Sequence, residues 1–370
     1  MAPDVNLGDL TQIQTGKLDA NASTPNGDYP FFTCAREPLR IASFSYDCEC
    51  VLVAGNGDLN VKYYQGKFDA YQRTYIVQAC PEATNRLHLR YVYHFLESHL
   101  ETLRQQSIGG IIKYIKIGNL ADAKIPLPPL AEQKRIARIL DVADALRAKR
   151  REAITQLDTL LQSTFLEMFG DPFSESSTSS HVPFSTLTQR ITYGFTSPMS
   201  HMESGIPILT AKNVLDGALD LDNIHYADQG EYDRLTAKSK PAFGDVLITK
   251  DGSIGRCAVV PDIGPLCINQ SVALIIPDRS LVMPEYISAY IRSRPVQQRI
   301  QRMGKGNALK HLQITELARF PSVLPPLELQ HHFATIVESA ERQKGAQRAH
   351  LAELNALFAS LQSRAFRGEL

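Results

Sequence analysis

The longest regular pattern in the chain is an apolar stripe that begins at Leu130 and continues to about Phe169. Apolar residues recur at intervals of three and four, the spacing of one face of an α-helix, and neither glycine nor proline interrupts them. Gly170 and Pro172 follow directly, and both residue types end helices. The pattern predicts a helix of about forty residues, which at about 1.5 Å per residue forms a rod on the order of 60 Å long.

A second stripe repeats the first. The segment Pro128–Gln133, at the start of the first rod, recurs 197 positions later as Pro325–Gln330, and a helical pattern then runs from about Leu327 to Phe366. Matching residues keep this register without a gap over roughly sixty positions, as expected of an internal duplication. Two rods with one apolar stripe each bury those stripes most economically against one another. The duplication therefore favours two antiparallel helices related by a pseudo-two-fold axis, while packing of each rod on its own unit remains an alternative.

Each rod is preceded by a region of short strand-like runs and turns. Runs of β-branched and aromatic residues between Gly, Asn and Pro are typical of strands, and one helical pattern follows them in each region. The expected elements are strands at 51–53, 74–77 and 246–249, an extended segment at 125–129, and helices at about 90–105 and 285–303. We therefore predict an α/β fold, of the α+β type, divided into residues 1–126, a helix at 127–170, residues 171–322 and a helix at 323–370.

The composition is that of a globular protein, with 44% apolar and 21% charged residues among 370, a length that suits two domains. No charged and apolar leader opens the sequence, and no apolar stretch approaches the roughly eighteen residues that span a bilayer. We therefore expect a cytoplasmic protein without a membrane segment. The six cysteines include no Cys-x-x-Cys pair, which favours free, reduced thiols.

The charge balance argues mildly against nucleic-acid binding. The chain has 39 basic and 39 acidic residues, whereas proteins that neutralise phosphates usually carry a basic excess. The objection weakens where basic groups gather on one face of the molecule. One basic run, at 134–151, is expected either to touch phosphates or to form a solvated or protein-docking face.

Known signatures of catalysis are missing from the sequence. It has no Gly-x-x-x-x-Gly-Lys-Ser/Thr phosphate loop, no Gly-x-Ser-x-Gly elbow and no His-Glu-x-x-His metal motif. The repeated Leu-Pro-Pro-Leu differs from the Asn/Asp-Pro-Pro-aromatic loop of amino-methyltransferases, and no glycine-rich loop follows a strand as a methyl-donor site requires. We expect no catalytic residue, no metal site and no cofactor in this chain.

Polar side chains in the turns of both regions are the candidates for contact with DNA. Asn and Gln pair with adenine, and Arg and Lys with guanine, because their donors and acceptors match. Any single one of them more often serves a turn or a solvated surface. The first region offers Gln14, Lys17, Asn56, Asn60, Lys62, Gln72 and Arg73, and the second offers Lys212, Asn213, Lys250, Ser253, Arg256, Asn269 and Gln270. A glycine-and-lysine turn ahead of each proline segment adds Lys113, Lys305 and Lys310, whose ammonium groups suit phosphates.

Several motifs together are similar to those of one protein family. Pro128–Gln133 leads a long helix that ends in Leu161–Pro172, and the second helix ends in Phe366–Leu370. In the second region, Gly205–Asn213 and Asp245–Gly252 are similar to target-recognition domains. In this order and with this doubling, the motifs resemble the DNA specificity subunit of type I restriction-modification systems.

This resemblance implies a non-catalytic subunit with two target-recognition domains, joined by two long antiparallel helices that pair like a coiled coil about a pseudo-two-fold axis. Each domain would read one half of a bipartite, asymmetric site on double-stranded DNA, and the helices would set the distance between the halves. The implied partners are two methyltransferase subunits, which bind S-adenosylmethionine and methylate a flipped adenine. Motor-nuclease subunits would join them for cleavage.

Three other interpretations remain. A helical scaffold that assembles proteins without reading DNA would share the predicted architecture. The specificity subunit of a related restriction-methylation enzyme would carry the same reading module. A stand-alone DNA-modifying enzyme is disfavoured by the missing catalytic loops. The second copy also departs from the family pattern at Leu329, where the first copy has Glu132.

Overall fold

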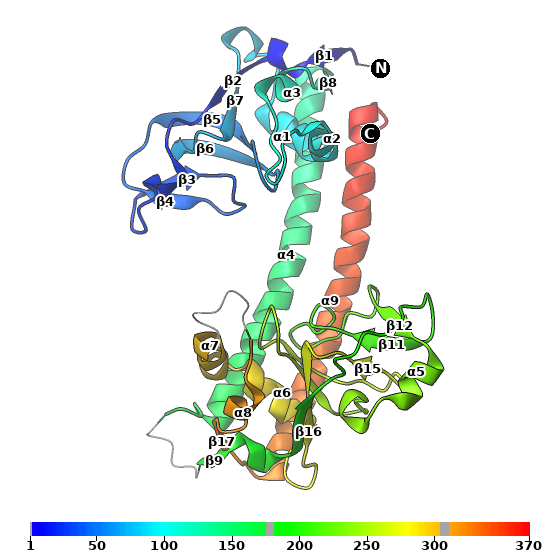
Figure 1. The fold of residues 1–370 in the computed structure, drawn as a ribbon. Helices are drawn as coiled ribbons and strands as arrows, with labels where there is room; N and C mark the ends of the chain where they lie inside the picture. The colour runs from blue at the N-terminus through cyan, green and yellow to red at the C-terminus, as the bar shows by residue number, and fades with distance from the viewer. Residues whose placement is uncertain (1, 175–180, 304–310) are drawn as a thin grey trace. The chain divides into compact units, whose positions relative to one another are not determined.

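The computed structural model describes residues 2–174, 181–303 and 311–370 (Figure 1). The chain divides into two compact units: the first unit consists of residues 1–151 and 348–370, and the second unit of residues 152–347. Each unit holds one region of mixed strands and helices together with part of both long helices, α4 (Leu130–Phe169) and α9 (Leu327–Arg367). The lengths of 40 and 41 residues confirm the two rods predicted from the apolar stripes.

The first unit is built on a six-stranded sheet in the order β2-β7-β5-β6-β3-β4. Its strands are β2 (Thr11–Thr15), β3 (Tyr29–Phe32), β4 (Leu39–Ile41), β5 (Tyr46–Ala54), β6 (Val61–Ala70) and β7 (Thr74–Ala79). All neighbours are antiparallel except β3 and β6. A two-stranded ladder of β1 (Asp4–Asn6) and β8 (Lys124–Pro126) and the helices α1 (Leu89–Ser98), α2 (Leu100–Gln106) and α3 (Ile117–Ala121) complete the unit. The strands at 51–53 and 74–77 and the extended proline segment are confirmed.

Helix α1 lies in the core of the first unit. Its apolar face buries Val92, Phe95 and Leu96, and the same core cluster contains residues of both long helices, among them Leu140 and Phe358. Burial of each such side chain contributes about 1.5–3 kcal/mol. This cluster therefore holds the sheet, α4 and α9 together within the first unit.

The second unit repeats this strand order with an interruption. Its strands are β9 (His181–Pro183), β10 (Thr188–Tyr193), β11 (Ile206–Leu209), β12 (His225–Ala227), β13 (Val246–Thr249), β14 (Cys257–Val259), β15 (Cys267–Ile268), β16 (Val272–Pro277) and β17 (Pro321–Val323). They form the orders β10-β16-β13-β14, β12-β11-β15 and β17-β9. The parallel pair of β11 with β15 corresponds to that of β3 with β6. One long strand of the first unit is thus replaced by β14 and β15, and the sheet is split in two.

The helices of the second unit are α5 (Gln229–Arg234), α6 (Pro284–Arg292), α7 (Arg294–Met303) and α8 (Ile314–Leu317). The sequence predicted one helix at about 90–105 and one at about 285–303, and both predictions were wrong in the same way, because each segment forms two helices. In the second unit the break falls at Ser293, which has an extended backbone. Pro295 explains it, since a proline ring clashes with the carbonyl four residues earlier in a continuous helix.

Helices α4 and α9 are antiparallel within each unit, because the residue numbers of their contacts change in opposite directions. The contacts pair Arg135 with Leu370 and Arg147 with Asn355 in the first unit, and Asp158 with Lys344 and Phe165 with Phe333 in the second. The antiparallel arrangement predicted from the duplication is therefore confirmed inside both units.

The duplication extends to individual polar contacts between the long helices. Arg147 donates to Asn355 at 2.8 Å and also pairs with the preceding Asp144 at 2.8 Å. Lys344, 197 positions later, pairs with Asp158 at 2.7 Å and with the preceding Glu341 at 2.6 Å. The Lys344 side chain is fully buried, so both carboxylates offset the cost of removing its charge from water.

Each long helix also begins with a buried glutamine. In the first unit the Gln133 side-chain oxygen accepts a hydrogen bond from the backbone N–H of His88 at 3.0 Å. Its amide nitrogen donates to the carbonyls of Arg86 and Pro128, both at 2.8 Å. The side chain thereby ties the start of α4 to the loop that precedes α1.

Gln330 repeats this arrangement in the second unit. Its oxygen accepts from the backbone N–H of Met283 at 2.9 Å, and its nitrogen donates to the carbonyls of Leu281 and Pro325 at 3.0 and 2.8 Å. Every partner stands 195 or 197 positions after its counterpart in the first unit. The sequence showed that this glutamine recurs but gave it no role. Its role is to fix the start of the long helix to the segment that precedes a short helix, α1 in the first unit and α6 in the second.

Candidate nucleic-acid interface

Five of the predicted DNA-contact residues lie together on neighbouring loops of the first unit. We call them the basic loop cluster: Lys17, Asn56, Gln72, Arg73 and Lys113. Lys17, Gln72 and Arg73 line one hollow of about 470 Å³ at the ends of β2 and β7. The backbone N–H of Gln72 donates to Leu18 at 2.9 Å, and the carbonyl of Arg73 accepts from Gly55 at 2.8 Å, so backbone bonds hold these loops side by side.

The loop that carries Lys113 joins the same cluster through its backbone. Ile108 and Tyr114 exchange two hydrogen bonds of 2.9 and 2.8 Å, and the carbonyl of Lys113 accepts from Gly57 at 3.1 Å. The Arg73 guanidinium lies over the Tyr114 ring at 5.9 Å from its centre. The cluster therefore presents three cations and two amides on a surface whose backbone is internally bonded.

Two isoleucines at the tip of this loop are exposed to solvent. Ile111 is fully exposed, and Ile112 is 63% exposed. Exposed apolar residues beside cations are suited to contact a thymine methyl group or the face of a base. Neither isoleucine was among the predicted contact residues, although two apolar residues in a glycine-containing turn are an unusual choice for solvent.

A glycine makes the close approach of these loops possible. A Cβ added to Gly16, directly before Lys17, would lie 2.1 Å from the carbonyl oxygen of Ala70. In the second unit a Cβ on Gly194 would lie 1.9 Å from the carbonyl oxygen of Ile268. No side chain fits at either position, so glycine is required at both. Gly16 lies where the chain after β2 passes the end of β6, and Gly194 lies where the chain after β10 passes the end of β15.

The corresponding loops of the second unit carry a different set of charges. Asp251 stands at the place of Asn56, since it forms the backbone bridge with His311 that Asn56 forms with Tyr114. Its carboxylate contacts His311 at 2.6 Å and the Lys250 ammonium at 3.2 Å. The charge of Lys250 is therefore balanced within the loop rather than offered to a ligand.

Three predicted contact residues are buried, among them Asn213. Its side-chain oxygen accepts from the N–H and hydroxyl of Thr210 at 3.0 and 2.8 Å, and its nitrogen donates to the carbonyls of Asp220 and Asn223 at 3.3 and 3.0 Å. All of its hydrogen-bonding groups are engaged. Asn213 organises its own loop.

Asn60 has a similar internal role in the first unit. Its nitrogen donates to the carbonyls of Cys34 and Asp58 at 2.9 and 2.8 Å, and its oxygen accepts from the Lys62 ammonium. Burial lowers the pKa of Lys62. Lys250 is the third buried residue.

The remaining predicted residues vary in exposure. Lys305 and Lys310 lie outside the residues that the structure describes. Exposed side chains are Gln14, Lys17, Gln72, Arg73, Lys113, Lys212, Ser253 and Gln270, and partly buried ones are Asn56, Lys62, Arg256 and Asn269. Gln14 lies on β2 and donates to Gln78 on β7 at 3.2 Å, away from the hollow.

Within the part of the chain that the structure describes, no cluster of three or more His, Cys, Asp and Glu side chains is arranged to hold a metal ion. No helix in that part is long and apolar enough to cross a membrane. All six cysteines are free thiols, and burial raises the pKa of Cys257 to about 12.

Comparison with known proteins finds relatives of this chain. Residues 3–156 match the family model described as the type I restriction modification DNA specificity domain. The specificity subunit of the type I restriction enzyme EcoDI from Escherichia coli is 38% identical over 158 residues, which cover 43% of this chain and 34% of that protein. The corresponding EcoBI subunit is 27% identical over 357 residues, which cover 87% of this chain and 74% of that protein. The EcoDI match thus spans about a third of its relative.

Solved structures show the same fold. The S subunit of the type I restriction-modification system from M. genitalium has a TM-score of 0.59 and 17% identity, covering 99% of this chain and 96% of that chain. A chain from a structure concerned with complex assembly and conformational transition of the type I system has a TM-score of 0.53 and 18% identity over both full chains. With two α/β regions, two long antiparallel helices and these relatives, the chain is similar to type I restriction-modification DNA specificity subunits and shares their fold.

Proposed function

We propose that this chain is the non-catalytic component that reads DNA for a type I restriction-modification complex and directs adenine methylation and cleavage by partner subunits. The observation that carries the proposal is the doubled unit. The two units share strand order, helix start and loop positions, yet they differ in the residues at their loop tips. Two recognition domains with different loop residues suit a bipartite site whose halves differ.

The proposal assigns one half-site to each domain. Residues 1–126 and 171–322 would be the two target-recognition domains, and residues 127–170 and 323–370 the helices that space them. The antiparallel contacts of α4 with α9 inside both units support a common spacer. A rod on the order of 60 Å is long enough to set two heads about one duplex turn, some 34 Å, apart.

Within the first domain, the basic loop cluster is the proposed contact surface. Lys17, Arg73 and Lys113 supply cations for phosphates or guanine, and Asn56 and Gln72 supply amides that suit adenine. Their side chains are exposed or partly buried, and backbone hydrogen bonds fix the loops that carry them. In the second domain, Lys212, Ser253, Arg256, Asn269 and Gln270 are the corresponding candidates.

The chemistry would be performed by other subunits in the cytoplasm. Two methyltransferase subunits would bind S-adenosylmethionine and methylate a flipped adenine, and motor-nuclease subunits would cleave the DNA. Similarity to type I specificity subunits and the missing catalytic motifs support this division of labour.

Exchange of one domain tests the proposal. Methylated adenines are mapped across the genome of cells with this gene, without it, and with residues 181–321 replaced by those of another family member. We expect one half of the methylated motif to change and the other half to remain. Replacement of the first domain is the matched control and should change the other half.

The same experiment separates the alternatives. A scaffold that does not read DNA would leave the motif unchanged in both exchanges, and a change in both halves after one exchange would overturn the assignment of one domain to each half-site. A related restriction-methylation enzyme is distinguished by the purified partner, because its methyltransferase and nuclease would lie in a single chain.

A further inference from the structure

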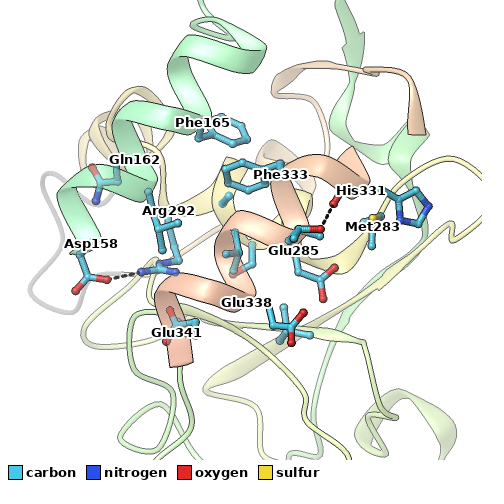
Figure 2. A pocket seen from close by; sticks show the side chains of 18 residues that line it. Asp158, Gln162, Phe165, Met283, Glu285, Arg292, His331, Phe333, Glu338 and Glu341 are labelled. Atoms are coloured by element: carbon cyan, nitrogen blue, oxygen red, sulfur yellow. Dashed lines mark hydrogen bonds and ion pairs between the residues drawn. The ribbon is translucent and has the colours of Figure 1, made fainter. Parts of the chain in front are cut away.

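The second unit contains a cavity of about 550 Å³ between its helices. Side chains from α4, α6 and α9 surround it, and Figure 2 shows Phe165 and Phe333 on one side and Glu285 nearby. A volume of this size lies in the range of sites that bind small ligands or inserted side chains. None of the residues proposed to contact DNA lines this cavity.

The first unit shows what occupies the same place in the other copy. Helices α1 and α6 begin 195 positions apart, at Leu89 and Pro284, and the paired long-helix segments are 197 positions apart. The glutamine contacts described above confirm both offsets. The residues that line the cavity can therefore be matched one by one with residues of the first unit.

In the first unit, this place is filled by a polar network around Asp141. The Nε of Arg90 donates to Asp141 at 3.2 Å, and the buried imidazole of His94 contacts the same carboxylate at 2.7 Å. The ring of Tyr93 lies 4.9 Å from both the Arg90 guanidinium and the His94 ring. Phe358 borders the network from α9.

In the second unit, the matching residues are smaller or opposite in charge. Ala289 replaces His94 and Ser288 replaces Tyr93, which removes two rings from the space between the helices. Leu161 likewise stands where the first unit has Phe358. The carboxylate is retained, since Glu338 matches Asp141. These exchanges account for the cavity.

The change at Glu285 leaves a carboxylate without a cation. Glu285 stands where the first unit has Arg90, and one of its oxygens is buried with no hydrogen-bond partner among the described residues. The other carboxylates of the lining are paired, for example Asp158 with Lys344 and Glu338 with Arg342. The Glu285 side chain is partly exposed, and a hydrogen bond donated to its one buried oxygen would recover the free energy that this unsatisfied atom costs.

We propose that this cavity binds the side chain of an arginine presented by a partner polypeptide. The inserted guanidinium would donate to Glu285 and occupy the space that Arg90, Tyr93 and His94 fill in the first unit. The inference does not rest on the DNA-reading function proposed above.

Arginine suits the cavity better than lysine or a metal ion. A planar guanidinium can donate two parallel hydrogen bonds to a carboxylate, and the buried Phe165 and Phe333 form part of the apolar lining. Within the described residues no set of side chains is arranged to hold a metal ion. The first unit supplies the precedent, because its own Arg90 lies over the rings of Tyr63 and Tyr93 at 4.6 and 4.9 Å.

A titration of the full chain with a blocked dipeptide tests the proposal. The probe is N-acetyl-tyrosyl-arginine amide, followed by saturation-transfer NMR, and its matched control has citrulline, which replaces the guanidinium by a neutral urea. We expect the arginine peptide to bind at least tenfold more tightly than the citrulline peptide, a difference of about 1.4 kcal/mol. Free arginine should bind no better than the blocked peptide, because the proposed arginine belongs to a polypeptide that continues on both sides of it.

Two variants locate the binding. Glu285→Gln should weaken binding of the arginine peptide at least tenfold, whereas Glu353→Gln, which removes an exposed carboxylate from α9, should leave it within about twofold. Glu285→Arg combined with Ala289→His rebuilds the network of the first unit. This double variant should abolish peptide binding and raise the melting temperature.

Several results would overturn the proposal. These are equal binding of the arginine and citrulline peptides, a preference for free arginine over the peptide, and no saturable binding up to about 10 mM. Undiminished binding by Glu285→Gln would also exclude it. If the double variant does not fold, the Glu285→Gln comparison decides the question alone.

Discussion

Between the two units, the starts of the long helices have diverged less than the loop tips of the sheets. Gln133 and Gln330 make the same three hydrogen bonds in the two units. At the loop tips, in contrast, Asn56 corresponds to Asp251. A buried amide must keep partners at fixed positions, whereas a partly exposed turn residue such as Asn56 can exchange its partner for water. A buried amide bonded to three backbone groups was thus preserved in both units, whereas the contact of the buried His94 with Asp141 was not, because Ala289 takes the place of His94.

The largest effect is expected at the two glutamines. Gln133→Ala leaves one buried N–H and two carbonyls without their partner, and the free energy of unfolding of the first unit should fall by about 3 kcal/mol. Gln330→Ala should lower the stability of the second unit by a similar amount. Hydrogen exchange of amides in each unit measures the two losses separately.

Neighbouring positions provide the control for this comparison. Glu132→Ala removes an exposed side chain that pairs with Arg135, and it should change stability by less than about 0.5 kcal/mol. A small loss for either glutamine variant would show that the contacts at the helix starts are not equivalent.

A smaller effect, confined to the first unit, is expected at the polar network around Asp141, which the second unit lacks. Asp141→Ala deprives the buried His94 and the half-buried Arg90 of their carboxylate, and should cost about 2 kcal/mol, an estimate reduced because Asp141 is itself about one-third exposed. Glu338→Ala, at the matching position, removes only a surface pair with Arg342 and should cost less than about 0.5 kcal/mol. Urea denaturation of both variants compares them; equal losses would contradict the assigned difference.

The same carboxylate should make the stability of the first unit depend on pH. Burial alone would raise the pKa of Asp141, but hydrogen bonds from Arg90 and His94 outweigh it and lower the pKa. A lowered folded pKa gives stability that is complete above the unfolded value of about 3.9 and is lost as the pH falls through the folded value. Wild type should therefore lose more stability than Asp141→Asn as the pH falls from about 5 to below 3. Urea midpoints across that range provide the test.

The smallest effect is expected at the exposed loops. Arg73→Ala or Lys113→Ala should each weaken binding of the full chain to duplex DNA about three- to tenfold and reduce the slope of its salt dependence by about 1. Lys124→Ala, an exposed cation on β8, is the matched control and should leave the slope unchanged. Fluorescence anisotropy at several salt concentrations measures all three; identical slopes would remove these residues from the interface.

The long helices could be predicted from the sequence because their apolar stripes persist for many turns. The same periodicity missed the break in the shorter helices, since one extended residue at Ser293 leaves the spacing of apolar residues almost unchanged. Pro295 was the available signal, because a proline is tolerated in the first turn of a helix but not in its interior.

The candidate contact residues could be predicted only by type and approximate place. Asn60 and Asn213 occur in turn sequences like the exposed Gln72, and only the folded loops show that their amides are buried and satisfied. The cavity was beyond sequence reasoning for another reason. It depends on which residues of α6 face α4 and α9, as Ala289 does, and this register between helices is a property of tertiary packing.

The split sheet of the second unit has a consequence for where the chain tolerates insertions. The segment between β14 and β15, residues 260–266, is largely exposed and already interrupts the hydrogen-bonded ladder. Extra residues inserted there would break no strand pairing, and doubling its length would cost only about 0.6 kcal/mol in loop-closure entropy. Insertions in this segment can therefore enlarge the second unit at the ends of β14 and β15 opposite Arg256 and Asn269, while the strand pairing is inherited intact.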